Sequence, residues 1–421
     1  MTWVQPLSMA NPNRSSWMAV ATLSVLALLI RLVWHGIASN RDWPDTASYL
    51  STGNALLNTG LMNETKYMPV YPLLISTIGY DDVLWLQFLL SAASVGLIAL
   101  LAQYVWQCKK AVVISGVLAA VYPLLIFYAN MRLTETVFIF LILAGFVACY
   151  RGFFGVGSFC LVLSILTRPA IDLIAPLLIV LFSLARGEMQ IGLIIRRLII
   201  YGVIYIVLMA PWWLHNQRLY GEFVRLNLAD GVMMMLESNK FIKPERRNEK
   251  GIDWEGVEAA FNKVSSMQLD LVAQNRAMKE LAWQYITEDP VRWGFDSLER
   301  FWRFWSPTPG SPLPIVNTIA LFTTAPIFLA ALLSIALMTR STLVRLAPIF
   351  AFAIFLTAVH TVTHAYYRYR LPLDPFLIVL AGGSIAVLLN SLNGKWTMGT
   401  AIGCRGSRSL FLLHQRVDLP S

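Results

Sequence analysis

A set of ionisable residues lies directly beside the long apolar runs of this sequence. Its members are Asp42, Asp45, Glu64, Lys66, Arg132, Glu135, Arg168, Asp172, His215, Arg218, Arg368 and Arg370. An ionisable group at membrane depth costs about 2.5 to 3.5 kcal/mol on insertion scales, so we expect charged residues in such places to have a function. Carboxylates can take a proton from an acceptor, and cationic donors can hold a phosphate leaving group. The set therefore predicts acid–base chemistry next to a phosphate site.

Asp45 follows the first apolar run and is the foremost candidate for a general base. It is also placed to cap a helix over Thr46–Leu57 that Gly60 would end, and the two roles are compatible. A carboxylate at a helix start, near the membrane surface and among cations, can remove a proton from a hydroxyl or amine. We therefore expect Asp45 to be the base, with Glu135 as a second acid that binds a metal or orients the acceptor.

Two local ion pairs are the simplest alternative explanation for several of these charges. Arg132 lies three residues before Glu135, and Arg168 lies four residues before Asp172, so each pair shares a helical face. In the functional interpretation Glu135 belongs to the site, and a bound phosphate supplies the hydrogen bonds that a buried Arg168–Asp172 pair needs. Both interpretations stay open from the sequence alone.

Cationic side chains are the candidates for holding a donor phosphate. They are Lys66, Arg168, Arg218, Arg368 and Arg370, with Arg218 and Arg370 preferred. Guanidinium suits phosphate because it can bind two oxygens at once. Contact with lipid headgroups is the simpler explanation for any single member, but their placement together on one side of the membrane favours a site.

Histidine and tyrosine residues near the same ends of the apolar runs are candidates for contact with an acceptor or sugar. We assign this role to Tyr49, His215, His364 and Tyr367. His360 and His364 have the four-residue spacing of a metal pair, but the signal is weak without the glutamate of a zinc-protease motif. A divalent metal is left open, and no other cofactor is indicated. Tyrosine clusters here are more typical of membrane-interface belts than of sugar platforms.

The elements that must position these residues are membrane-spanning helices. The chain has 421 residues, of which 57% are hydrophobic and 14% charged, the composition of a polytopic membrane protein. A span needs about 20 mainly apolar residues, and such runs predict about ten transmembrane helices in an all-α fold. The runs are 17–37, 83–106, 111–128, 133–150, 153–166, 169–185, 191–213, 315–338, 343–363 and 371–389.

The basic residues predict the orientation of the chain. Lysines and arginines recur in alternate short connections, which places these connections and both termini in the cytoplasm by the positive-inside tendency. The net charge of +9 is spread over many loops and forms no stripe, so no nucleic-acid partner is implied. We expect a multi-pass protein of the cell inner membrane, surrounded by membrane lipids, with its active site outside the cytoplasm.

Two loops outside the membrane are the expected working parts, and they define the domains. The first, 38–82, reads as helical pieces along the membrane surface, and a second helix begins near Pro69. The larger, 214–313, is polar at 243–253 and then aromatic in a helix opened by Asp289 and Pro290. The boundaries are 1–213 for an N-terminal catalytic module, 214–313 for the large loop, 314–394 for the C-terminal helices and 395–421 for a cytoplasmic tail. No glycine-rich phosphate loop supports a nucleotide donor.

Six segments in this order resemble the polytopic glycosyltransferases of type C fold (GT-C). They are WPDTASYLSTGNALLNTG at 43–60, KYMPVYPLLI at 66–75, RLTETVFIF at 132–140, LTRPAIDLIAP at 166–176, APWWLHNQRLYGEFV at 210–224 and YYRYRLPLDPFLIVLAG at 366–382. The sequence is similar to bacterial relatives of the protein O-mannosyltransferases and of the aminoarabinose and galacturonic acid transferases that modify lipopolysaccharide. The likeness covers most of the chain, except that a longer soluble C-terminal domain, frequent in such enzymes, has no counterpart after Leu389.

The resemblance implies a reaction and roles for individual residues. A sugar would pass from a polyprenyl-phosphate donor to an extracytoplasmic glycan, lipid or protein, with inversion at the anomeric carbon. The acidic residue of the first outer loop acts as base in this family, and Asp45 matches that position. Lys66 resembles a lysine associated with the donor phosphate, although the spacing to the following prolines differs.

Three alternatives remain, one of which is a noncatalytic assembly subunit with a degenerate site. An O-antigen polymerase or ligase also has many spans, a large outer loop and outer arginines, and it would not require Asp45. A transporter or flippase of lipid-linked glycans would use paired charges as a route, but inverted repeats and mid-membrane charges would then be expected.

Overall fold

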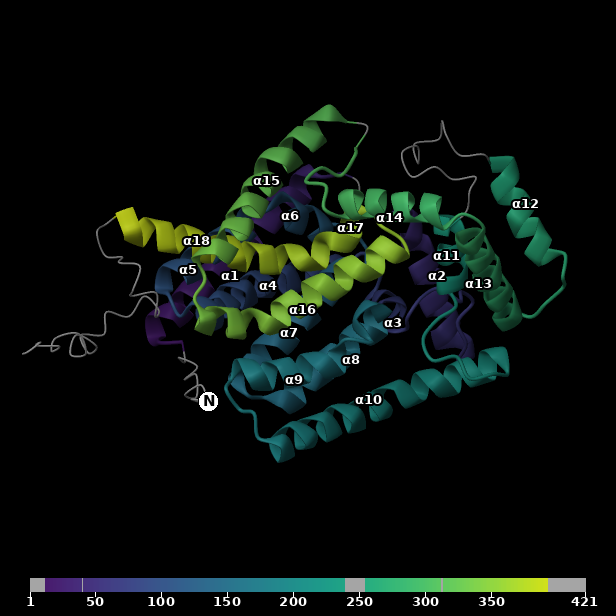
Figure 1. The fold of residues 1–421 in the computed structure, drawn as a ribbon, viewed down its shortest axis with the longest axis horizontal. Coiled ribbons are helices and arrows are strands. Elements are labelled where there is room, and N and C mark those ends of the chain that lie inside the picture. The colour runs from purple at the N-terminus through teal and green to yellow at the C-terminus, as the bar shows by residue number, and fades with distance from the viewer. Residues whose placement is uncertain (1–11, 40, 239–253, 312, 393–421) are drawn as a thin grey trace, which may run out of the picture.

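The computed structural model describes residues 12–39, 41–238, 254–311 and 313–392, and every regular element in these ranges is a helix. The all-α prediction is confirmed. The N-terminal half contains α1 (Arg14–Ile37), α2 (Pro44–Thr59), α3 (Val70–Ile78), α4 (Val83–Trp106), α5 (Lys109–Val121), α6 (Pro123–Ala129), α7 (Glu135–Arg151), α8 (Phe154–Thr167), η1 (Pro169–Ile171), α9 (Ala175–Ala185) and α10 (Ile191–Tyr220) (Figure 1).

The C-terminal half contains α11 (Asp230–Ser238), α12 (Trp254–Ser265), α13 (Leu271–Glu288), α14 (Pro290–Phe304), α15 (Pro314–Leu337), α16 (Arg340–Val362), α17 (Tyr367–Arg370), η3 (Leu371–Leu373) and α18 (Asp374–Leu392). The expected polar stretch 243–253 and the expected cytoplasmic tail 395–421 lie outside the described residues.

Six helices of the described chain are long and apolar enough to span a membrane. They are α1, α4, α10, α15, α16 and the region Tyr367–Leu392, and α5 with α6 makes a seventh if the pair, bent by 54°, is one span. α7, α8 and α9 have only 17, 14 and 11 residues. The predicted apolar runs all fall on helices, but a count of ten spans is not confirmed.

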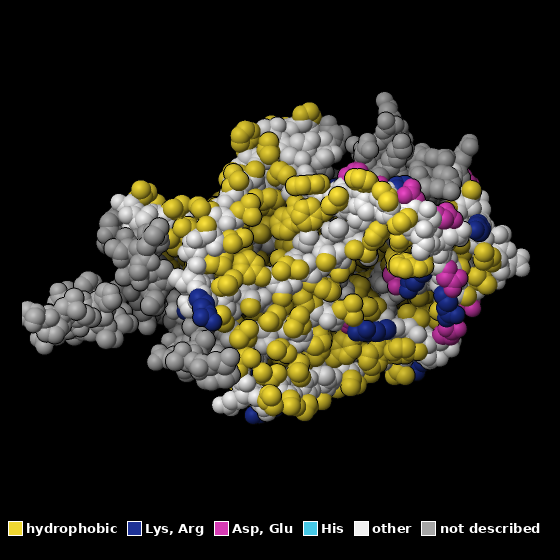
Figure 2. All heavy atoms as spheres, viewed as in Figure 1, with side chains coloured by type: hydrophobic (Ala, Val, Ile, Leu, Met, Phe, Trp, Pro, Cys, Tyr) yellow, Lys and Arg dark blue, Asp and Glu magenta, His cyan; other side chains and the backbone are white. Residues whose placement is uncertain are grey.

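The bundle has a buried centre and an apolar periphery. Most of α4 and α18 is buried, whereas α10 runs along one edge and exposes Ile195, Ile199 and Ile206 (Figure 1). Figure 2 shows an apolar face over the bundle, with most of the visible acidic and basic side chains gathered toward the end that carries α11 and α13. Since lipid tails are as apolar as these side chains, such a face is stable in a bilayer.

Small residues of α18 allow the close packing of this centre. Trp106 donates its indole N–H to the carbonyl of Val379 at 2.9 Å, and its ring lies against Gly383. A Cβ atom built at Gly383 would be 1.8 Å from this ring, and one at Gly382 would be 2.1 Å from Ser115 Oγ. Only glycine fits at these two positions without movement of the neighbours.

Arg31 of α1 stabilises the bend between α5 and α6. Pro123 has no N–H, so it cannot donate to the carbonyl four residues earlier. Arg31, which is fully buried, donates from Nη1 to Ala120 O at 2.7 Å and from Nη2 to Ala119 O at 3.5 Å, and its Nε donates to Ser91 Oγ at 3.1 Å. The guanidinium thus satisfies carbonyls that the bend exposes.

The two expected outer loops lie together at one end of the bundle. The first contributes α2, which Gly60 ends in a left-handed conformation as predicted, and α3, which starts directly after Pro69. In the second, α11, α12 and α13 share a small core that includes Met235, Val264 and Leu281. Leu228 N donates to Thr65 O at 3.0 Å and connects the two loops.

α14 has one exposed apolar face. Asp289 caps it by accepting from Arg292 N at 2.9 Å, and Pro290 is its first residue, as predicted. The exposed face consists of Val291, Phe295, Leu298 and Trp302. Its spacing is that of one side of a helix, as expected of a helix that lies at the membrane surface.

Candidate active site

Asp45 lies in the first turn of α2, not at its cap. The helix begins at Pro44, where a missing N–H costs nothing, and Trp43 is the residue before it. Trp43 N donates to Thr46 Oγ1 at 2.9 Å, and Thr46 Oγ1 donates to Arg132 O at 3.1 Å. The prediction that Asp45 caps the helix is therefore wrong. Its carboxylate is available for other contacts.

The carboxylate of Asp45 belongs to a cluster of two acids and two arginines. Arg368 Nη2 lies 3.0 Å from Asp45 Oδ2, and Arg368 Nε lies 3.5 Å from Glu135 Oε1. Arg168 Nη1 donates to the same Glu135 oxygen at 2.8 Å. Four predicted site residues from distant parts of the sequence therefore meet in one place, and their formal charges cancel.

Breaks in the helices present these side chains. Glu135 is the first residue of α7, and Arg368 is in the short helix α17 that precedes α18. Arg168 is extended at φ −147° and ψ 126° because it precedes Pro169, which disfavours helix in the residue before it. The arginine side chain is thereby directed out of the α8 axis toward α7.

Exposure divides the cluster into a buried and an accessible part. The Glu135 side chain is 1% exposed, those of Arg368 and Arg168 are 12% and 15% exposed, and that of Asp45 is 28% exposed. Glu135 is therefore suited to holding the two guanidinium groups in position. Asp45 is the carboxylate that an incoming molecule can reach.

Aromatic rings enclose the guanidinium groups. Arg368 lies 5.7 Å from the Trp43 ring and 5.6 Å from the Tyr369 ring, and Arg168 lies 5.3 Å from the Tyr369 ring. Such contacts stabilise a cation and orient its plane. Trp43 and Tyr369 were not predicted as site residues, although each lies within two positions of a predicted one.

Tyr67 is a further residue that sequence analysis missed. Its hydroxyl lies 3.4 Å from Asp45 Oδ1, and its ring centroid is 4.4 Å from that of Tyr49, which is buried. Burial, together with the Asp45 carboxylate, raises the pKa of Tyr67. Its hydroxyl therefore stays protonated and can donate to Asp45. Its position directly after the predicted site residue Lys66 was the signal in the sequence that could have identified it.

Lys66 lies at the edge of this group, with its ammonium 5.0 Å from the Tyr67 ring and 3.9 Å from Glu64. Burial lowers the pKa of Lys66, but the Tyr67 side chain and the carboxylates of Glu64 and Asp45 outweigh this effect, so that the net shift is upward. Lys66 therefore stays cationic, and it is 45% exposed.

The two local ion pairs considered from the sequence do not form. Arg132 contacts Asp42 at 2.8 Å and Asp81 at 3.1 Å instead of Glu135. Asp172 accepts a hydrogen bond from the Tyr205 hydroxyl at 2.6 Å and pairs with Arg225, not with Arg168. Because Arg132 and Asp172 have these other partners, Glu135 and Arg168 pair with each other.

The two arginines preferred from the sequence lie elsewhere. Arg370 is buried and pairs with Asp374 at 3.0 Å, and it donates to the carbonyls of Phe304 and Ser306. It therefore joins the end of α14 to α18. Arg218 is exposed in the last turn of α10 and forms no ion pair within the described part of the chain.

The remaining candidate contacts are distributed around the cluster. His215 Nε2 accepts from Met62 N at 3.0 Å and so anchors the segment that leads to Lys66. His364 Nδ1 contacts Glu237 of α11. Tyr367 directly precedes Arg368 and is half-buried, with its ring 4.7 Å from Tyr366. Among the described residues, no three His, Cys, Asp or Glu side chains are grouped so as to hold a metal ion.

The fold has known counterparts, although the sequence does not. No protein-family model matches the chain, and no curated protein matches it in sequence. The apo crystal structure of the Archaeoglobus fulgidus oligosaccharyltransferase aligns with a TM-score of 0.52 and 13% identity over 93% of this chain and 52% of that chain. The A. fulgidus oligosaccharyltransferase AglB in complex with an inhibitory peptide and a dolichol-phosphate aligns with a TM-score of 0.55 and 12% identity. This alignment covers 94% of this chain and 52% of that chain.

ArnT from Cupriavidus metallidurans bound to undecaprenyl phosphate is also similar, with 14% identity over 89% of this chain and 60% of that chain. Its TM-score of 0.45 adds nothing to the assignment of the fold. The chain has the fold of the two oligosaccharyltransferase structures, the GT-C fold expected from the sequence, and it spans about half of their length.

Proposed function

We propose that the protein is an integral membrane glycosyltransferase that moves a sugar from a polyprenyl-phosphate donor to an acceptor outside the cytoplasm. One observation carries this proposal: Asp45, Glu135, Arg168 and Arg368 meet in one cluster. Such a cluster combines an accessible base with two donors suited to phosphate.

Arg168 and Arg368 are the proposed ligands of the donor phosphate. Each guanidinium has five N–H donors. Within the described residues, Arg168 uses one of them on Glu135, and Arg368 makes its contacts to Asp45 and Glu135 with Nη2 and Nε. Donors therefore remain on both groups for the oxygens of a phosphate. Lys66, cationic and exposed nearby, is a further candidate.

Asp45 is the proposed base for the acceptor. The acceptor oxygen or nitrogen attacks the anomeric carbon and loses its proton to Asp45. The bond from that carbon to the phosphate oxygen breaks, and the lipid phosphate leaves with the electron pair, its charge balanced by the arginines. A single displacement of this kind inverts the anomeric configuration.

The structural likeness supports the donor class. AglB, whose fold this chain shares, was solved with a dolichol-phosphate and an inhibitory peptide. We infer that a polyprenyl phosphate also binds here, at the side of the membrane where α2, α3 and α11–α13 lie. The acceptor is a glycan, lipid or protein of the cell envelope, and the expected location is the inner membrane with both termini in the cytoplasm.

The experiment is mass spectrometry of envelope lipids, polysaccharides and proteins from cells that have or lack this chain. The proposal predicts a difference of one sugar residue on one class of molecule, restored by the wild-type chain and not by the Asp45→Asn variant. A change in polymer length alone would favour the polymerase alternative. An unchanged set of glycans would exclude both enzymes.

A further inference from the structure

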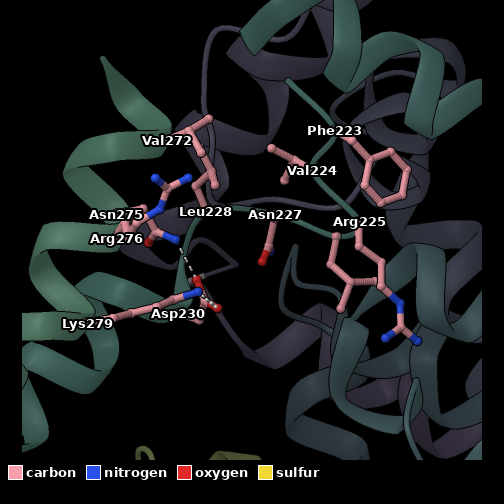
Figure 3. A pocket seen from close by; sticks show the side chains of 11 residues that line it. Phe223, Val224, Arg225, Asn227, Leu228, Asp230, Val272, Asn275, Arg276 and Lys279 are labelled. Atoms are coloured by element: carbon pink, nitrogen blue, oxygen red, sulfur yellow. Dashed lines mark hydrogen bonds and ion pairs between the residues drawn. The ribbon is translucent and has the colours of Figure 1, made fainter. Parts of the chain in front are cut away.

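A cavity of about 320 Å³ lies at the end of the bundle that carries α11 and α13, apart from the Asp45 cluster. It is formed between the segment 223–228, which follows α10, and one face of α13. Figure 3 shows Arg276 and Lys279 on the α13 side, Phe223 and Arg225 on the opposite side, and Asn227 between them. Ligand pockets in proteins start at about 300 Å³, so the cavity has room for a small ligand.

The lining favours an anionic, partly apolar ligand. It contains the cationic side chains of Arg225, Arg276 and Lys279 and the carboxylate of Asp230. Arg225 pairs with Asp172 and Lys279 pairs with Asp230, so Arg276 is the cation of the three that has only a long contact. Apolar groups of Phe223, Val224, Leu226, Leu228 and Val272 form the rest, together with the amides of Asn227 and Asn275. Saccharides combine polar hydroxyls with apolar ring faces, so this mixture suits an acidic sugar.

The cations of α13 differ in how firmly they are held. Lys279 pairs with Asp230 at 2.5 Å, and Asn275 donates to the same carboxylate at 2.9 Å, which fixes that corner. Arg276 lies 3.8 Å from Glu222, and its side chain is 66% exposed. Its contact is long and solvated, so its N–H donors are available to an incoming anion.

The cavity is linked to the candidate active site through hydrogen bonds to the first loop. Asn227, which lines it, donates to the carbonyl of Lys66 at 2.7 Å, and Leu228 N donates to Thr65 O at 3.0 Å. Lys66 is followed by Tyr67, whose hydroxyl lies 3.4 Å from Asp45 Oδ1. A ligand in the cavity therefore lies beside the segment that carries the site.

We propose that this cavity binds an anionic group, a carboxylate or a phosphate, on the saccharide that accepts the transferred sugar. The assignment as an acceptor site depends on the proposed function, whereas binding itself does not. Arg276 supplies the contact to the anion, and the Phe223 ring covers the sugar.

The test is a binding titration of the full-length protein in detergent at low salt. The ligands are glucuronate, glucose 6-phosphate and glucose, which share a ring and differ in charge. We expect both anionic sugars to bind more tightly than glucose. Arg276→Gln should weaken anion binding about fivefold, because a solvated charge contributes up to about 1 kcal/mol.

The matched control is Lys263→Gln, which removes one exposed charge from the end of α12, outside the cavity. It should leave binding unchanged, and so should Asp45→Asn, which separates this site from catalysis. The stronger of the two anionic ligands identifies the group recognised. Equal binding of glucose and glucuronate, or equal losses in Arg276→Gln and Lys263→Gln, would overturn the proposal.

Discussion

The guanidinium of Arg368 lies 3.0 Å from the carboxylate of Asp45, although 323 positions separate the two residues in the sequence. Arg368 also lies 3.5 Å from Glu135, so that a single side chain joins α2 to α7. A donor phosphate that engages Arg368 would weaken its hold on Asp45 and leave this carboxylate able to accept a proton. We therefore expect donor binding to prepare the base.

Replacement of Arg168 or Arg368 by lysine should impair use of the donor. Lysine keeps the charge but cannot bind two phosphate oxygens in the fixed geometry of a guanidinium. We expect kcat/KM for the donor to fall roughly 10- to 100-fold, a loss of about 1.4 to 2.7 kcal/mol in transition-state binding. Steady-state kinetics with a purified polyprenyl-phosphate sugar would measure this loss.

Arg218→Lys is the control for these variants, because Arg218 is exposed and lies outside the cluster. Its kinetics should match those of the wild type. If Arg218→Lys lost as much activity as Arg368→Lys, the donor phosphate would have to bind at the end of α10.

The pH dependence of transfer should have no alkaline limb below about pH 9. The pKa of Tyr67 is raised, so its neutral hydroxyl persists to higher pH than that of a free tyrosine, whose pKa is about 10. The pKa of Lys66 is also raised, so its charged form persists as well. Initial rates from pH 6 to 9 test this. A fall above pH 7.5 that Tyr67→Phe removes would contradict it.

Two glycine variants test the packing of α18 against α4. Gly383→Ala places a methyl group 1.8 Å from the Trp106 ring, so overpacking should cost about 1–3 kcal/mol and lower the melting temperature in detergent. Gly202→Ala, on α10, meets no atom within 4 Å apart from the adjoining backbone of its own helix, and it should leave the melting temperature equal or higher. Equal melting temperatures for the two variants would show that α18 does not pack on Trp106 as described.

The helices could be predicted from the sequence because apolar runs and their breakers are local signals. Pro290 and Asp289 marked the start of α14, and Gly60 marked the end of α2, since each acts through its own backbone. The same local signals led to the wrong prediction that Asp45 caps α2. Pro44, one residue earlier, is an equally good first helical residue and determines where α2 begins.

The membership of the site could be predicted only in part, since it depends on contacts between distant segments. Helical spacing favoured Arg132 as the partner of Glu135, but Arg132 is drawn to Asp42 and Asp81 in the first loop. Arg370 and Arg368 are two positions apart and equally cationic. Arg370 pairs with Asp374, four residues later, and this spacing is a local signal that the sequence contains. Only the three-dimensional packing of α17 directs Arg368 toward Asp45.

The most direct test of the proposed function compares Asp45→Asn with Asp82→Asn in a transfer assay, with donor binding measured on the same preparations. Asp82 is an exposed carboxylate of the same loop and has no assigned role. A general base contributes about 10²- to 10⁴-fold, so Asp45→Asn should lose this much in kcat while it still binds the donor. Asp82→Asn should keep the wild-type rate. Transfer by Asp45→Asn at the rate of Asp82→Asn would contradict the assignment of Asp45 as the base.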